Sequence, residues 1–166
     1  MLKFKEALFI FVLILLPFSL FAFNFEDYEW GKNQEQVLSG IKSKNKQIIK
    51  TDNPRVLKYF DKILDEDCTI MLEFTPKTKL LSSIKIVWSE KSVGKDLKKL
   101  LSDKYGQYRQ PNAFIEEYYW YGASEYDAIV LDFDYAGTTV SYFGGAFHKQ
   151  YEAEFDELMK QEKLRF

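Results

Sequence analysis

The chain has 166 residues, of which 46% are hydrophobic and 17% aromatic. This composition can fill a packed core, whereas a disordered chain is short of both classes. The formal charge of −2 lacks the basic excess that nucleic-acid binding requires, so we expect no nucleic-acid partner.

The N-terminal segment has the pattern of an export signal. Lys3 and Lys5 precede an uncharged apolar run from Ala7 to Phe23, and the small residue Ala22 marks the expected cleavage point. The pattern predicts a signal peptide over residues 1–23. Without the two lysines and one glutamate of that segment, the formal charge becomes about −3.

An uncleaved anchor is the alternative, because the apolar run approaches the roughly 17 residues that a membrane-spanning helix needs. Membrane contact would then be confined to residues 7–23. In both cases residues 24–166 are translocated. We therefore expect one periplasmic or secreted domain, since a chain of this length has the usual size of a single domain.

The rest of the chain resembles itself at a separation of 59 residues. Ile70–Phe74 (IMLEF) matches Ile129–Phe133 (IVLDF), and the same offset relates Tyr59 to Tyr118. Self-similarity at a fixed offset predicts two tandem repeats. The expected bounds are about 30–88 and 89–143. A longer connection, Thr75–Lys79, follows the matched strand in the first copy, and insertions of this kind belong in loops.

Each copy is expected to begin with a helix. In the first, Asn33 is a plausible N-cap with Gln36 three residues later, and Val37, Leu38 and Ile41 follow. In the second, Ser92 is the expected cap and Gly106 the stop. The apolar residues of that second helix share one face: Val93, Leu97, Leu100, Leu101 and Tyr105.

Three strands are expected to follow each helix. In the first copy these are Val56–Phe60, Cys68–Thr75 and Ser83–Trp88. In the second they are Phe114–Tyr121, Ala128–Asp134 and Thr138–Phe143. Gly144 and Gly145 mark a hinge before a last helix over residues 146–162, whose apolar stripe is Phe147, Tyr151, Phe155, Leu158 and Met159. The pattern predicts an α+β fold, with helices on one face of an antiparallel sheet.

A resemblance to a known fold accompanies this pattern. Trp30-Gly31 opens a short helix that contains Val37, and Tyr105-Gly106 stops the second helix before an aromatic strand, a hydrophobic strand and a glycine turn. The tandem arrangement resembles the β-lactamase-inhibitor-protein fold, and the single unit is similar to small lipoproteins of outer-membrane assembly. The chain departs from them in having no lipidated cysteine, no Gly-Met-Thr-like helix opening, and an extra C-terminal helix. The resemblance implies a non-catalytic, protein-binding module of the bacterial envelope.

No constellation for catalysis, cofactor binding or metal binding stands out. The lone His148 is expected to be solvated at the start of a helix, and Cys68 lies on the core parity of its strand, so we expect an inert buried thiol. A nucleophile pair formed by these two residues is the alternative. Asp65-Glu66-Asp67 is interpreted as a solvated turn, because it lacks the spaced ligands of a calcium loop. We expect no cofactor and no metal.

The aromatic run Tyr118–Tyr121 is the strongest candidate for function. Alternation along a strand sends two of its rings to each face of the sheet, so one pair is expected to be exposed unless a helix covers it. The candidate binding residues are Tyr118, Tyr119, Trp120, Tyr121, Tyr135 and Trp88.

Two functions fit this aromatic face. We expect an envelope protein that holds a protein or peptide and is not an enzyme. The alternative is an envelope glycan-binding protein or glycan-acting enzyme, with sugars stacked on the same rings and acids drawn from Glu116, Glu117, Asp132 and Asp134.

Overall fold

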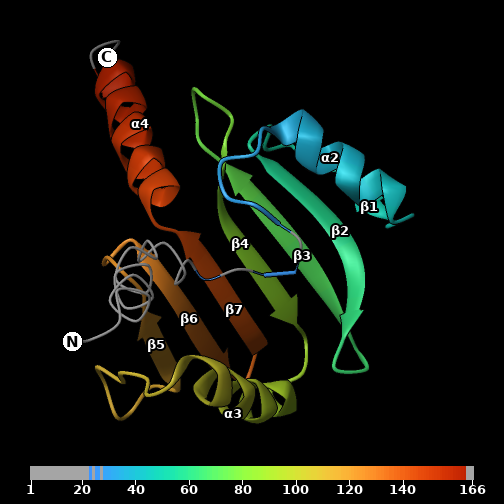
Figure 1. Ribbon diagram of the computed structural model, residues 1–166, viewed down its shortest axis with the longest axis vertical. Helices are drawn as coiled ribbons and strands as arrows, with labels where there is room; N and C mark the ends of the chain where they lie inside the picture. The colour runs from blue at the N-terminus through green and yellow to red at the C-terminus, as the bar shows by residue number, and fades with distance from the viewer. Residues whose placement is uncertain (1–22, 24, 27, 164–166) are drawn as a thin grey trace, which may run out of the picture.

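The computed structural model describes residues 23, 25–26 and 28–163, and within them it has three helices and one seven-stranded antiparallel sheet (Figure 1). This confirms the predicted α+β class. The helices are α2 (Gln34–Ser43), α3 (Ser92–Tyr105) and α4 (Ala146–Lys163). The strands are β1 (Ile48–Ile49), β2 (Val56–Ile63), β3 (Glu66–Phe74), β4 (Leu81–Trp88), β5 (Glu117–Tyr121), β6 (Asp127–Asp134) and β7 (Gly137–Gly144).

The strand order is β1-β2-β3-β4-β7-β6-β5. In chain order, α2 is followed by four strands, β1 to β4, and α3 by three, β5 to β7. The last strands of the two units, β4 and β7, pair antiparallel at the centre, with Ile86 opposite Val140. This pairing makes one continuous sheet. A common origin of the two units stays a prediction from the matched sequences.

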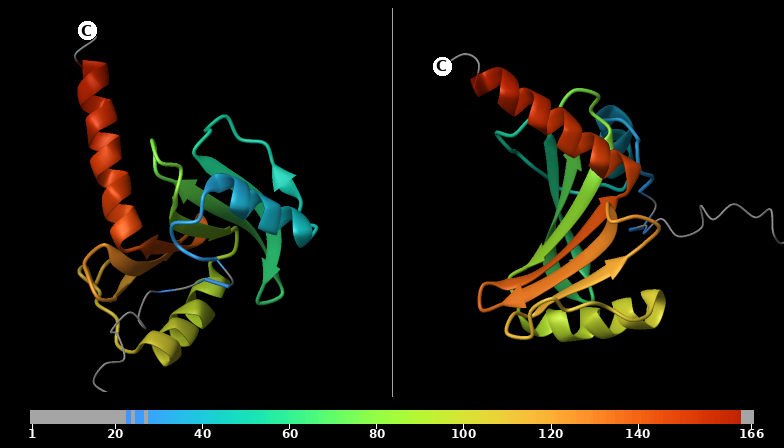
Figure 2. Two further views of the ribbon diagram at one scale, coloured as in Figure 1. Left: turned by 45° about the horizontal axis from the view of Figure 1, so that its top comes forward. Right: turned by 90° about the vertical axis from the view of Figure 1, so that its left-hand side faces the viewer.

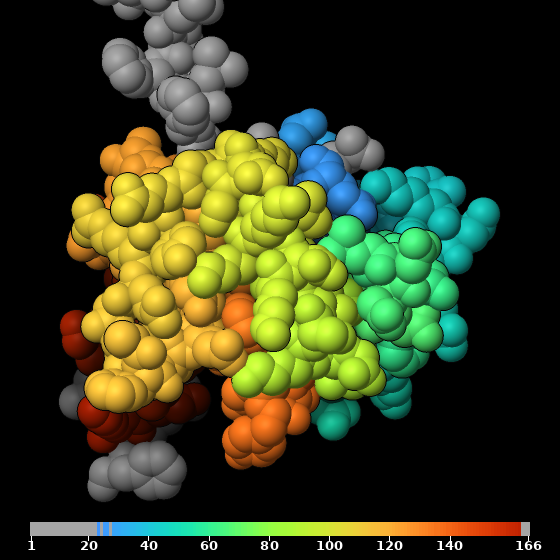
Figure 3. All heavy atoms as spheres, turned by 90° about the horizontal axis from the view of Figure 1, so that it is seen from below, coloured from blue at the N-terminus to red at the C-terminus, as the bar shows by residue number. Residues whose placement is uncertain are grey.

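One face of the sheet, called the inner face here, carries the core. Strand alternation places Ile70, Ile86, Leu131 and Val140 on it, and all four are almost fully buried. Val37 and Ile41 of α2 and Val93, Leu97 and Leu101 of α3 belong to the same cluster. The inner face is thus covered by these two helices, and Figure 3 shows α3 and the loop after it filling this end of the molecule.

The helix ends follow the sequence in part. Asn33 and Gln36 form the predicted capping box, and Gly106 ends α3 at a φ of +83°. Ser92 is not the cap: it is the first residue of α3, and Lys91 before it makes no side-chain capping bond. Leu100, predicted on the apolar face of α3, is exposed. Gly94 brings α3 close to the sheet, because a Cβ there would lie 2.3 Å from the Phe133 ring.

The C-terminal helix α4 lies on the opposite, outer face. His148 packs its ring 4.5 Å from that of Phe143, and the Tyr151 hydroxyl donates to Glu73 at 2.8 Å; Phe143 and Glu73 both point away from the inner core. Figure 2 shows α2 and α3 on one side of the sheet and α4 directed to the other. The expectation of helices on one face therefore holds for α2 and α3 only. The chain changes sides at Gly145, whose φ is +47°.

One strand bound differs from the prediction in a way that matters for the site. β5 begins at Glu117, and Phe114 lies in the preceding loop with 98% of its surface exposed. The two-residue strand β1 was not predicted, because two residues carry no measurable alternation.

Phe23, the first described residue, belongs to the core. Phe23 is buried, its ring meets that of Tyr105 edge-on at 4.8 Å, and its carbonyl accepts a bond from the Trp30 indole at 2.8 Å. The packed domain thus includes Phe23, one residue before the expected boundary at residue 24. The rest of the predicted signal lies outside the described residues. Among the residues that are described, no helix is both long and apolar enough to cross a membrane.

Candidate functional site

The aromatic run divides between the two faces of the sheet. Tyr118 and Trp120 point into the inner core and are 5% and 1% exposed, and the Trp120 indole donates to the Gly106 carbonyl at 3.0 Å. Trp88 is equally buried. These three residues are therefore corrected from candidate binding residues to core residues, because all three belong to the buried apolar cluster of the inner face.

Of the other three candidates, Tyr121 and Tyr135 are exposed and Tyr119 is half-buried, and the three lie in two separate places. Tyr119 and Tyr121 lie on the outer face of β5, with Tyr121 45% exposed. Tyr135 is 97% exposed, but it lies in the turn after β6, whereas Tyr121 pairs with Ala128 near the start of that strand. The structure thus brings Tyr119 and Tyr121 together and leaves Tyr135 apart.

Tyr119 and Tyr121 form one side of a groove of about 620 Å³, called the outer groove here. Its floor is the outer face of β5, β6 and β7, and its far side is the first turn of α4. The lining residues are Glu117, Tyr119, Tyr121, Glu125, Tyr126, Ala128, Val130, Ser141, Phe143, His148 and Glu152.

The two tyrosine rings are stacked against each other. They are nearly parallel, at 9°, with centroids 5.9 Å apart, and the Arg109 guanidinium lies 5.4 Å from the Tyr121 ring. Burial, together with hydrogen bonding to Glu117, raises the pKa of Tyr119 to about 12. The Tyr119 hydroxyl is therefore a neutral hydrogen-bond donor at physiological pH.

His148 forms the opposite side of the groove and is less solvated than expected. Its side chain is only 20% exposed, and its Nδ1 atom is buried with no hydrogen-bond partner. Burial lowers its pKa, although the nearby carboxylates of Glu152 and Glu73 act in the other direction. His148 does not pair with Cys68, which faces the inner core; burial raises the pKa of that thiol to about 11.

The groove lining is acidic. It holds the carboxylates of Glu117, Glu125 and Glu152 and no lysine or arginine. Asp132 lies directly across from Glu117 on the same face, and its pKa is raised by burial and by the neighbouring Asp134 and Glu117. Like charges at this spacing repel, so a cation bound in the groove would relieve the repulsion.

The remaining acidic candidates have structural roles. Glu116 makes an ion pair with Lys91 at 2.5 Å, and Asp134 accepts a bond from the Ala136 amide in the β6–β7 turn. Asp65-Glu66-Asp67 is exposed at the β2–β3 turn, as predicted. Among the described residues, no three histidine, cysteine, aspartate or glutamate side chains gather closely enough to hold a metal ion.

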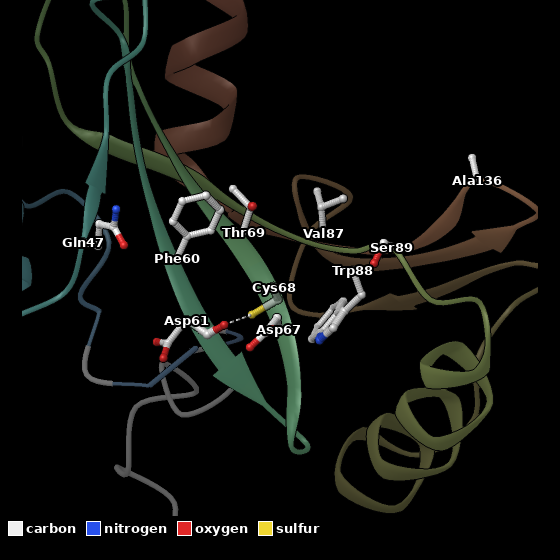
Figure 4. Close-up of a pocket in the computed structure, with 10 residues that line it drawn as sticks. All are labelled: Gln47, Phe60, Asp61, Asp67, Cys68, Thr69, Val87, Trp88, Ser89 and Ala136. Atoms are coloured by element: carbon white, nitrogen blue, oxygen red, sulfur yellow. Dashed lines mark hydrogen bonds between the residues drawn. The ribbon is translucent and has the colours of Figure 1, made fainter.

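A second hollow, of about 640 Å³, lies beside β2, β3 and β4. Figure 4 shows Phe60, Thr69 and Val87 on one side of these strands and Cys68 and Trp88 on the other. Its side chains include no aromatic pair comparable to Tyr119 and Tyr121. The outer groove is therefore the better candidate site.

Comparisons with protein-family models, with curated proteins and with solved structures find no match to this chain. The resemblance to the β-lactamase-inhibitor-protein fold stays a prediction.

Sequence reasoning missed eight of the eleven residues that line the groove, and those with polar or aromatic side chains that matter most are Glu125, Tyr126, Phe143, His148 and Glu152. Only one signal pointed to them: His148 and Glu152 are four residues apart and so share a helix face.

Proposed function

We propose that this chain is a non-catalytic protein of the bacterial envelope, exported by its N-terminal segment, that binds a protein or peptide in the outer groove. The observation that carries the proposal is the lining of that groove. The Tyr119 and Tyr121 rings and three carboxylates share one concave surface whose lining includes no lysine or arginine. Aromatic residues are enriched in protein interfaces and rarely form an exposed concave surface without a partner.

The charge of the groove favours a basic partner segment. A lysine or arginine side chain can lie over the Tyr119 and Tyr121 rings while its charge approaches Glu117, Glu125 or Glu152. Arg109 of the chain itself already lies over the Tyr121 ring, so a cation is compatible with this ring. We therefore expect an extended segment that carries at least one basic residue.

Two exposed tyrosines provide a matched crosslinking test. A photoreactive residue is placed at Tyr121, inside the groove, or at Tyr135, in the β6–β7 turn, of the exported protein. The photoreactive residue at position 121 should form a crosslink to one envelope protein, and the same residue at position 135 should form no crosslink to that protein. A synthetic peptide covering the crosslinked segment should then bind the purified protein, and the double variant Tyr119→Ala/Tyr121→Ala should lose that binding while Tyr135→Ala keeps it.

Binding that survives the double variant, or that Tyr135→Ala weakens equally, would contradict the proposal. Envelope glycan is the second candidate, because parallel tyrosine rings beside carboxylates also suit the stacking of sugar rings. A pull-down with purified peptidoglycan tests it. If peptidoglycan retains the wild-type protein but not the double variant, the ligand of the outer groove is a glycan and not a peptide.

A further inference from the structure

The buried carboxylate of Asp127 has no cationic partner among the described residues. Asp127 is the first residue of β6, it faces the inner side of the sheet, and only 6% of its surface is exposed. Its Oδ2 atom accepts a bond from the Ala123 amide at 3.3 Å. Its Oδ1 atom is buried and has no hydrogen-bond partner. A buried carboxylate without a counter-charge is costly, and it marks a place where a cation is expected.

The main chain of Phe23 lies against this carboxylate. The Phe23 carbonyl accepts a bond from the Trp30 indole, and the Trp30 ring is so close to Gly144 that a Cβ there would lie 2.5 Å from it. Gly144 is the register partner of Asp127 on the neighbouring strand. Burial raises the pKa of Asp127, and the nearby main-chain amides of Ala123 and Phe23 partly oppose this rise.

Phe23 is held in place by its side chain and by its carbonyl. Its ring is buried against Tyr105 of α3, and its carbonyl is fixed by Trp30. The nitrogen of Phe23 is thus positioned by contacts that do not involve the residues before it. It is also the nitrogen of the bond after Ala22, the small residue at which the sequence predicts cleavage of the export signal.

We propose that cleavage of the Ala22–Phe23 bond turns this nitrogen into an α-ammonium group that pairs with Asp127. The export machinery's signal peptidase would catalyse the step with water as co-reactant. Water adds across the peptide bond, so the released segment ends in the Ala22 carboxylate and the mature chain begins with the Phe23 ammonium. An amide N–H offers one proton, whereas an ammonium offers three together with a positive charge. It can therefore serve both carboxylate oxygens, including the unpartnered Oδ1.

Through this ion pair between the Phe23 ammonium and the Asp127 carboxylate, removal of the signal supplies the counter-charge that the buried carboxylate lacks. Before cleavage the carboxylate is buried beside a neutral amide; after cleavage it is buried beside a cation. This inference rests on the exported location in the proposed function but not on the outer groove, which lies on the other face of the sheet. Failure of groove binding would leave it intact, and its own failure would leave groove binding intact.

The first measurement is the intact mass of the protein produced from the full chain and recovered after export. We expect a mature chain that begins at Phe23. A chain that begins elsewhere, or that keeps residues 1–22, would overturn the proposal.

The second measurement compares four proteins in thermal unfolding. The chain that begins at Phe23 is matched with one carrying a single extra glycine before Phe23, and each is also made with Asp127→Asn. The extension restores an amide at Phe23 and moves the charge by one residue. We expect it to lower the unfolding midpoint by several degrees when Asp127 is present and to have little effect in the Asp127→Asn background. An equal loss in both backgrounds would overturn the pairing.

The third measurement remains decisive if Asp127→Asn does not fold. The pKa of the Phe23 α-amino group is measured from the pH dependence of its acetylation in the native protein. Pairing with Asp127 should raise this pKa above the ordinary value of about 8. The titratable groups placed around it by the contacts above are Asp127 of β6 and Tyr105 of α3. An ordinary or lowered pKa would show that no ion pair forms.

Discussion

The two faces of the sheet are covered in chemically different ways. On the inner face, α2 and α3 meet the strands through an apolar cluster that includes Tyr59, Trp88 and Trp120. On the outer face, α4 is attached largely by polar and titratable groups. Glu154 accepts bonds from the Lys77 amide at 2.6 Å and from the Thr78 amide and hydroxyl at 3.2 and 2.8 Å, and Tyr151 donates to Glu73.

This difference between the faces assigns stability of the fold to the inner face and partner binding to the outer face. Apolar burial on the inner face has little dependence on pH and leaves no free surface, whereas the outer cover is partial and responds to protonation. A binding protein needs both properties, namely a scaffold that does not change and a surface that remains open. The predictions below test this division, beginning with the largest effect.

Truncation of an inner-face ring should have the largest effect on stability. Trp120→Ala removes a 1%-exposed indole and its bond to Gly106, and a change of this kind costs about 3–5 kcal/mol. The free energy of unfolding by urea measures it. Trp120→Phe, which keeps a ring, should cost clearly less. An alanine variant as stable as wild type would show that the inner face does not carry the fold.

Loss of the Glu154 contacts should have the next largest effect. Glu154→Ala leaves the two amides of the β3–β4 connection without their acceptor, which costs about 1–3 kcal/mol. The matched control is Glu157→Gln, one turn further along α4, which loses only an exposed ion pair with Lys77 and should cost much less. Equal costs for the two variants would contradict the role given to Glu154.

The Glu154 contribution should also disappear in acid. Although burial acts in the opposite direction, the hydrogen bonds from Lys77, Thr78 and Gln150 hold the pKa of this carboxyl below its usual value of 4.5. The folded state therefore binds its proton more weakly than the unfolded state does. The stability that Glu154 adds is complete above about pH 4.5 and is lost as the pH falls further. The difference in unfolding free energy between wild type and Glu154→Ala should narrow over this range.

Much of the fold was predictable from the sequence because it is encoded locally. Alternation located the hydrophobic strands, the capping box located α2, and the five-residue match suggested two similar units. The sequence also predicted that the connection at Thr75–Lys79 is longer than the one between β6 and β7, and the strand bounds confirm this. The role of this connection in holding α4 was not predictable, because its amides donate hydrogen bonds to the Glu154 carboxylate, which lies about eighty residues further along the chain.

The exposed half of the aromatic run could not be predicted. Every residue from Tyr118 to Tyr121 is aromatic. Strand alternation therefore places Tyr118 and Trp120 on one face of the sheet and the other two rings on the opposite face, but it does not tell which face is buried. The choice depends on distant groups: the Tyr118 ring meets that of Tyr108 at 4.9 Å and that of Phe133 at 5.7 Å. Similarly, the apolar stripe of α4 indicates that the helix buries one side but not which face of the sheet it covers. That choice is made at Gly145.

A smaller effect should come from His148, between α4 and the outer face. Burial lowers the pKa of its imidazole below the ordinary 6.5, so the folded state favours the neutral form. Stability is then complete above about pH 6.5 and decreases as the pH falls through the lowered pKa, because the unfolded state takes up the proton first. The thermal midpoint of wild type should decline over this interval more than that of His148→Gln. Identical pH profiles would show that the imidazole does not titrate on unfolding.

The smallest effect on stability is expected where the effect on binding is largest. Tyr121 is 45% exposed on the outer face, so Tyr121→Ala should change the free energy of unfolding by about 0.5 kcal/mol or less. Trp120, its neighbour in the chain, lies on the other face, and its truncation should destabilise the protein several times more. Urea unfolding of the two alanine variants in parallel measures the contrast. Comparable losses would mean that the outer rings belong to the core after all, and that the outer groove is a packing feature that does not bind a partner.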